Sequence, residues 1–178
     1  MYLQVLAFWF EEITPAQRWV KDESFDQLIL DRFSTLHTQA SQCELYEWRK
    51  TAKGRLAEII VLDQFSRNMF RNSPQSFAYD SLALALSQEA IALKAEAELT
   101  AEERSFLYMP FMHSESLAIH QIATTLFEEN GIESNYHYEI RHKEIIERFG
   151  RYPHRNKILG RESTEEEIQF LMEPGSGF

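Results

Sequence analysis

The sequence predicts an all-α protein of seven to eight helices arranged in antiparallel hairpins. Three observations support this fold class. Apolar residues recur at helical spacing through most of the chain, helix-capping and helix-breaking residues separate these segments, and no segment has a convincing strand pattern. At 178 residues, the chain has the length of one domain with a substantial core. We therefore expect a single all-helical domain over residues 1–178.

The N-terminal half contains the helix expected at the centre of the fold. Residues 2–10 are very apolar and precede Pro15, and residues 23–37 show helical spacing. In residues 51–70 the apolar side chains cover most of the helix circumference, which is typical of a central helix. Asp63 and Glu58 lie within its apolar arcs. We expect Arg67 to pair with Asp63, and Arg55 to pair with Glu58, because three- and four-residue spacings meet on a helix.

Each boundary in the C-terminal half has a local chemical signal. Residues 76–98 are rich in the helix formers Ala, Leu, Glu and Lys. Thr100 and Glu103 form a capping-box pattern that opens a helix over 100–109, and Pro110 is expected to end it. Further helices are expected at 111–129, 133–149 and 163–172.

Composition limits the kinds of partner that the chain could have. The formal net charge is −10, which argues against a general nucleic-acid-binding protein. No apolar stretch approaches the roughly 20 residues needed to cross a bilayer, so no membrane partner is expected. Residues 1–10 have no basic segment typical of a secretory signal. We expect a cytoplasmic protein, and the sequence leaves its oligomeric state open.

One short segment reverses the acidic composition. Residues 148–161 contain five basic residues and no acid, and we call this segment the cationic turn. Gly150 ends a helical pattern and Pro153 prevents its continuation. Its ligand-binding candidates are Arg151, His154, Arg155 and Asn156. Arginine presents a planar fork suited to carboxylate or phosphate, although the same groups could instead tie the C-terminal segment to buried acids.

Further candidates lie on the expected helices: Asp63, Arg67, His113, Glu115 and His142. A buried carboxylate requires a partner, and Glu115 has none nearby in sequence. Its expected partner is a histidine or an arginine of the cationic turn. We therefore predict that a group of five residues converges in space: Arg67, Glu115, His142, His154 and Arg155.

The histidines do not form an established metal-binding motif. A site assembled from His113, Glu115, His142 and His154 is the less favoured alternative, because no recognised ligand spacing is present. We accordingly predict no metal and no cofactor.

Four ordered sequence blocks resemble a known family. They are Val5 to Phe10, Leu62 to Arg71, Tyr108 to Glu115, and His142 to Thr164. Together they are similar to the bacterial family called domain of unknown function 924, over essentially the whole chain. The resemblance implies a tetratricopeptide-like helical fold and supplies no reaction. In that family an acid often follows the His-Ser-Glu triplet, where this chain has Ser116.

Two functions remain open at this point. The favoured one is a binding module whose pocket or groove takes an anionic small molecule or peptide. The alternative is a hydrolase-like acid–base enzyme, with Glu115 or His154 as the catalytic group and arginines holding an anionic substrate. A closed cavity containing Glu115, His142 and His154 would favour the enzyme, whereas structural pairing of all three would favour the module.

Overall fold

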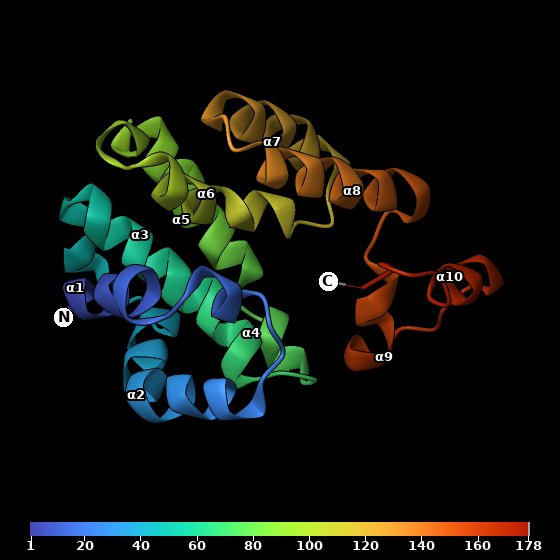
Figure 1. The fold of residues 1–178 in the computed structure, drawn as a ribbon, viewed down its shortest axis with the longest axis horizontal. Helices are drawn as coiled ribbons and strands as arrows, with labels where there is room; N and C mark the ends of the chain where they lie inside the picture. Colours follow the sequence, from blue (N-terminus) through green and yellow to red (C-terminus); the bar gives the residue numbers. More distant parts are fainter. Residues whose placement is uncertain (178) are drawn as a thin grey trace.

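The computed structural model describes residues 1–177, which contain helices and no strand (Figure 1). The helices are α1 (Tyr2–Ala7), α2 (Glu23–Ser41), α3 (Ala52–Ile60), α4 (Ser66–Met69), α5 (Asp80–Ala92), α6 (Ala101–Met112), α7 (Leu117–Asn130), α8 (Glu133–Phe149), α9 (Asn156–Leu159) and α10 (Glu165–Phe170). When directly adjoining helical segments are joined, the described residues contain nine helices, eight of them seven residues or longer. The all-α fold class is confirmed.

The expected central helix is present, and it contains an irregular segment. α3 continues through a π-helical segment, Val61–Phe65, into α4. All five residues of the π-helical segment are buried. Such segments are rare and occur frequently at functional sites. Here the irregular backbone lies where Asp63 enters the core.

The boundary expected at Pro110 is wrong. α6 runs through Pro110 to Met112, and the chain turns at residues 113–116 before α7 begins at Leu117. Proline removes one helical hydrogen bond, but only two more helical residues follow it, and Phe111 and Met112 are buried. The burial of these two side chains holds the last turn of the helix. As a consequence, His113 and Glu115 lie in the connection after α6, whereas His120 lies on α7.

One of the two expected ion pairs on the central helix is wrong. Arg49 forms a bidentate salt bridge with Glu58, and the Nε–Oε2 and Nη2–Oε1 distances are both 2.7 Å. Arg55 instead pairs with Glu89 on α5, at 3.1 Å. A buried carboxylate is stabilised best by a bidentate guanidinium, which the segment before α3 supplies.

The C-terminal segment packs around a small second core. Its buried members are Ile145, Ile146 and Tyr152, and two partly buried rings, Phe149 and Phe170, pack against them. α8 ends at Gly150, which has a left-handed φ of 68°. A 3-10 turn, Pro153–Arg155, then leads into α9 and α10. Figure 1 shows α9 and α10 at one end of the molecule, beyond the end of α8.

Tyr152 joins this second core to the rest of the protein. Its side chain is fully buried, and its hydroxyl donates to the Met112 carbonyl at the end of α6. The same hydroxyl lies 3.1 Å from Nε2 of His120 on α7. The cationic turn is therefore attached to two other helices through one phenol.

None of the described helices combines the length and the apolar character needed to cross a membrane.

We expect Tyr152→Phe to lower the free energy of unfolding by about 2 kcal/mol, because it leaves the buried Met112 carbonyl without its donor. Urea unfolding followed by circular dichroism measures this change. Tyr46→Phe is the control, because Tyr46 is 60% exposed, and it should leave stability unchanged. Equal midpoints for the two variants would contradict the anchoring role of Tyr152.

Candidate functional site

A cavity of about 300 Å³ lies between the start of α5, the end of α6 and the C-terminal segment. Its polar wall is formed by Asp80, Ser81, His113, Ser114, Glu115 and Arg155. Its apolar wall includes Pro74, Phe77, Leu84, Pro110 and Leu159. A cleft that combines apolar side chains with a few convergent polar groups is typical of a small-molecule site.

Asp80 holds two arginines together at this cavity. Arg67 contacts it through both terminal nitrogens, with Nη1–Oδ1 and Nη2–Oδ2 each 2.9 Å. Arg155 contacts Oδ2 through Nη1 at 3.3 Å. Because Asp80 is the first residue of α5, its carboxylate also lies at the positive end of a helix. The Asp80 carboxylate thus balances the charges of Arg67 and Arg155 and the positive end of α5.

Arg155 lies between two aromatic rings. Its guanidinium carbon is 4.5 Å from the Phe77 ring centre and 4.6 Å from the Tyr152 ring centre. The residue is only 6% exposed, and burial together with the nearby Arg67 charge lowers its pKa. Nη2 donates to the His113 carbonyl at 3.0 Å, whereas the buried Nε has no hydrogen-bond partner within residues 1–177.

Asp63 and His113 form a hydrogen-bonded pair behind the polar wall. The His113 Nδ1 atom is 2.8 Å from Asp63 Oδ1. Gln64 donates to the other carboxylate oxygen at 2.6 Å, and Arg67 Nη1 lies 3.1 Å from Oδ1. Burial raises the pKa of Asp63, but the Arg67 charge together with the hydrogen bonds from His113 and Gln64 outweighs burial and holds that pKa well below its usual range.

These contacts fix the tautomer of His113. The Asp63 carboxylate is ionised and can only accept, so Nδ1 of His113 carries the proton. Burial, and then the Arg67 charge, lower the pKa of His113, which keeps the ring neutral near pH 7. Nε2 is then a lone-pair acceptor, and none of the hydrogen bonds found for residues 1–177 uses it. A neutral, oriented imidazole in a cavity wall has the properties of a general base.

Glu115 is paired, as predicted, with the cationic turn. Arg161 contacts it through Nη1–Oε2 at 2.7 Å and Nη2–Oε1 at 2.9 Å. The Tyr152 backbone N–H also donates to Oε1, at 2.7 Å. Burial raises the pKa of Glu115, but the Arg161 contact, the Tyr152 N–H and the Arg155 charge together outweigh burial, so the pKa is lowered. The group is a carboxylate that fixes the turn, which argues against the proposed role of Glu115 as a proton carrier. Ser116 caps α7 and does not line the cavity.

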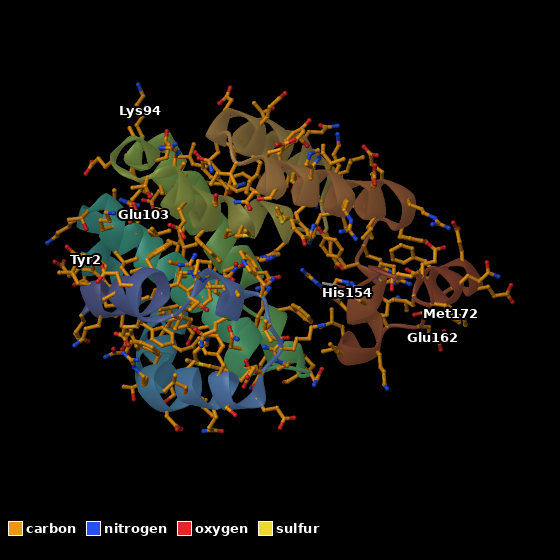
Figure 2. All side chains as sticks on the ribbon, in the orientation of Figure 1. Tyr2, Lys94, Glu103, His154, Glu162 and Met172 are labelled. Carbon is orange, nitrogen blue, oxygen red and sulfur yellow. The ribbon has the colours of Figure 1, made fainter. Side chains whose placement is uncertain are left out.

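His142 and His154 pack against the Tyr152 ring, at ring-centre distances of 5.7 Å and 5.6 Å. The Nδ1–H of His142 donates to the Tyr138 carbonyl at 2.7 Å. Burial lowers the pKa of His142 far below its ordinary value. Burial and the Arg155 charge also lower the pKa of His154, to about 3. Neither histidine lines the cavity; Figure 2 labels His154 beside α9.

Arg151 and Asn156 connect the C-terminal helices instead of lining the cavity. Arg151 contacts Glu167 through Nε at 2.6 Å and Nη2 at 2.8 Å. The Asn156 amide donates to Ser163 at 3.0 Å and accepts from the Nε of Arg161 at 2.9 Å. The contacts of Arg151 and Asn156 therefore match the alternative in which the cationic turn ties the C-terminal segment to buried acids.

The predicted convergence is observed in part. Glu115 and Arg155 line the cavity, and Arg67 joins Arg155 through Asp80. His142 and His154 pack against the Tyr152 ring and do not line the cavity. Sequence reasoning missed Asp80 and Phe77. The acid at the start of a helix was the one available signal for Asp80, and it is too common to indicate a site.

No group of three or more His, Cys, Asp or Glu side chains in the described chain is arranged to hold a metal ion. The charged groups at the cavity are almost balanced. Arg67 and Arg155 face Asp63 and Asp80, and Arg161 faces Glu115. Arg155 lines the cavity and has a buried Nε without a hydrogen-bond partner in the described chain, and the surrounding charges leave no large excess of positive charge.

The sequence profile of the family described as "Bacterial protein of unknown function (DUF924)" matches residues 5–175. The chain belongs to this family. It is also similar to a solved structure, "Structure of Protein of Unknown Function ATU0120 from Agrobacterium tumefaciens", with a TM-score of 0.91 and 38% sequence identity over 96% of each chain. None of the curated proteins is detectably similar. The DUF924 assignment confirms the resemblance found in the sequence, and the function has to be argued from the cavity.

We expect Asp80→Asn to lower the free energy of unfolding by about 3 kcal/mol, because removing one partner of a largely buried ion pair leaves charge uncompensated. Chemical denaturation measures the change. The matched control is Glu147→Gln, which removes an exposed partner of Lys143, and exposed pairs contribute little. A wild-type midpoint for Asp80→Asn would show that Asp80 does not hold the two arginines.

A second expectation concerns the acid side of the stability profile. The folded-state pKa of His154 is about 3 and its unfolded value is near 6.5. Between these values the unfolded chain binds the extra proton, so stability falls as pH decreases from 6.5 toward 3. His154→Asn should reduce the slope of unfolding free energy against pH in this window, by up to about 1.4 kcal/mol per pH unit.

The control for the pH experiment is His137→Asn, because the His137 side chain is 66% exposed. Its slope between pH 4.5 and 6 should equal that of the wild type. If His154→Asn also keeps the full slope, the buried neutral state of His154 is refuted.

Proposed function

We propose that this DUF924 protein binds a small monocarboxylate in the cavity, with Arg155 as the anchoring residue. The observation that carries the proposal is the buried guanidinium of Arg155, whose Nε has no partner within residues 1–177 and which belongs to the cavity wall. Arginine has five N–H donors, and the protein uses few of those on Arg155. A buried donor without an acceptor is destabilising, so an oxygen acceptor supplied by a ligand would stabilise this site.

The charges around Arg155 favour one negative charge over two. A planar carboxylate matches the guanidinium fork. A phosphate dianion would bring a second negative charge toward Asp80 and Glu115, which line the same cavity. Since those two acids are already paired with arginines, little positive charge remains to offset it. We therefore favour a carboxylate over a phosphate.

The apolar residues that line the cavity indicate the chemistry of the rest of the ligand. Phe77, Leu84 and Leu159 present apolar surface to the cavity, and burial of apolar ligand surface contributes roughly 25 cal/mol per Å². A carboxylate with a small aromatic or aliphatic body satisfies both walls. The volume of about 300 Å³ is at the low end for ligand pockets, which favours a small molecule over the peptide alternative.

We also propose that the successive packing of α6, α7 and α8 reflects a tetratricopeptide-like arrangement. Such architectures commonly use helix faces for binding. Support from the fold is an analogy, so the ligand proposal rests on Arg155 and the cavity.

The test is binding of benzoate, measured by isothermal titration calorimetry and by thermal shift. Wild-type protein should bind benzoate and melt at a higher temperature in its presence. Arg155→Lys should weaken binding at least tenfold, because lysine lacks the planar fork. Inorganic phosphate should bind more weakly than benzoate.

Arg148→Lys is the matched control, since Arg148 also lies over aromatic rings but is exposed and pairs with Glu166. It should bind benzoate as the wild type does. Equal affinity in the wild type and Arg155→Lys, or no binding of benzoate to the wild type, would refute the proposal.

A further inference from the structure

His113 lines the cavity that Arg155 also lines, and Asp63 lies behind it as the hydrogen-bond partner of its Nδ1 atom. The backbone carbonyl of His113 accepts from Arg155 Nη2 at 3.0 Å, so the anchor and the imidazole are neighbours. Asp63 is held from both sides by Gln64 and Arg67, which fixes the direction of its hydrogen bond to His113. The irregular π-helical backbone over Val61–Phe65 places this carboxylate at its position.

This arrangement is more than the anchoring of a carboxylate requires. A carboxylate ligand needs donors, and the Nε2 atom of a neutral His113 offers a lone pair instead. An acceptor oriented by a carboxylate on its other side is the arrangement that activates a hydroxyl group or water in acyl-transfer enzymes. Asp63 would stabilise the positive charge that the imidazole acquires when it takes a proton.

The attacking group is indicated by what surrounds His113. Two serines line the cavity, Ser81 and Ser114, but no hydrogen bond within residues 1–177 joins either hydroxyl to the His113 ring. The Ser114 hydroxyl instead accepts from the Ser116 backbone N–H at 3.2 Å. Water, which can enter the cavity, is therefore the group that His113 can deprotonate.

We propose that the cavity hydrolyses an ester bond within the small carboxylate that it binds, with His113 as the general base. The inference rests on the proposed function, because Arg155 has to hold the substrate carboxylate. Nε2 of His113 takes a proton from water while the water oxygen bonds to the ester carbonyl carbon. The tetrahedral intermediate then breaks its bond to the alcohol oxygen, and the imidazolium returns the proton to that oxygen. The products are a carboxylic acid and an alcohol, and His113 is again neutral.

The experiment uses 4-acetoxybenzoate, which carries a carboxylate, an apolar ring and an ester. Its hydrolysis to 4-hydroxybenzoate is followed by ultraviolet absorbance. Wild-type protein should hydrolyse it with a kcat/KM at least tenfold above that for phenyl acetate, which lacks the carboxylate. The rate should rise with pH and level off by pH 7, and benzoate should inhibit competitively with a constant equal to its Kd.

Replacement of the base separates the two proposals. His113→Gln should lose at least 100-fold in kcat and still bind benzoate with an affinity close to wild type. His137→Gln, at an exposed histidine, should keep full activity, which controls for hydrolysis by surface imidazoles. If His113→Gln does not fold, the wild-type selectivity, pH profile and benzoate inhibition decide the question.

Two results overturn the catalytic inference and leave the binding proposal intact. One is wild-type protein that binds benzoate but hydrolyses 4-acetoxybenzoate no faster than buffer. The other is His113→Gln protein with wild-type kcat. Failure of the wild type to bind benzoate overturns both proposals.

Discussion

The burial of Tyr152 is the constraint on which the site depends. Its hydroxyl donates to the Met112 carbonyl, its backbone N–H donates to Glu115, and its ring contacts Arg155. One residue thus fixes the end of α6, the connection after it and the cationic turn relative to one another. Without this attachment the guanidinium of Arg155 would not reach the cavity, because Arg155 lies only three residues farther along the chain.

The same attachment brings charged side chains from distant segments into a largely buried region. Buried charges persist only when they are paired and hydrogen-bonded. Asp80 is the ion-pair partner of both Arg67 and Arg155, and Arg161 is the partner of Glu115. The pairing uses up most of the positive charge of the turn. Arg155 keeps a buried Nε for which residues 1–177 supply no acceptor, and the ligand proposal depends on this atom.

His113 gains its chemical character from this electrostatic balance. The Asp63 carboxylate fixes its tautomer, while burial and Arg67 lower its pKa. The imidazole that we propose as a base and the guanidinium that we propose as an anchor therefore line the same cavity. Glu115 and His154, the catalytic candidates suggested by the sequence, have other environments: one is an ion-paired carboxylate, and the other lies outside the cavity wall.

Local sequence patterns alone determined the all-α fold, the central position of residues 51–70 and the break at Gly150; they showed that Glu115 needs a partner, and the fold decided that this partner is Arg161 and not His142 or His154. Apolar periodicity, capping residues and the need to neutralise buried charge act over short distances or by composition, so they can be read from the chain. The continuation of α6 through Pro110 was decided by tertiary packing of Phe111 and Met112. The role of Asp80 was likewise decided only by the fold, since its partners lie 13 and 75 residues away. No local pattern records a contact between such distant residues.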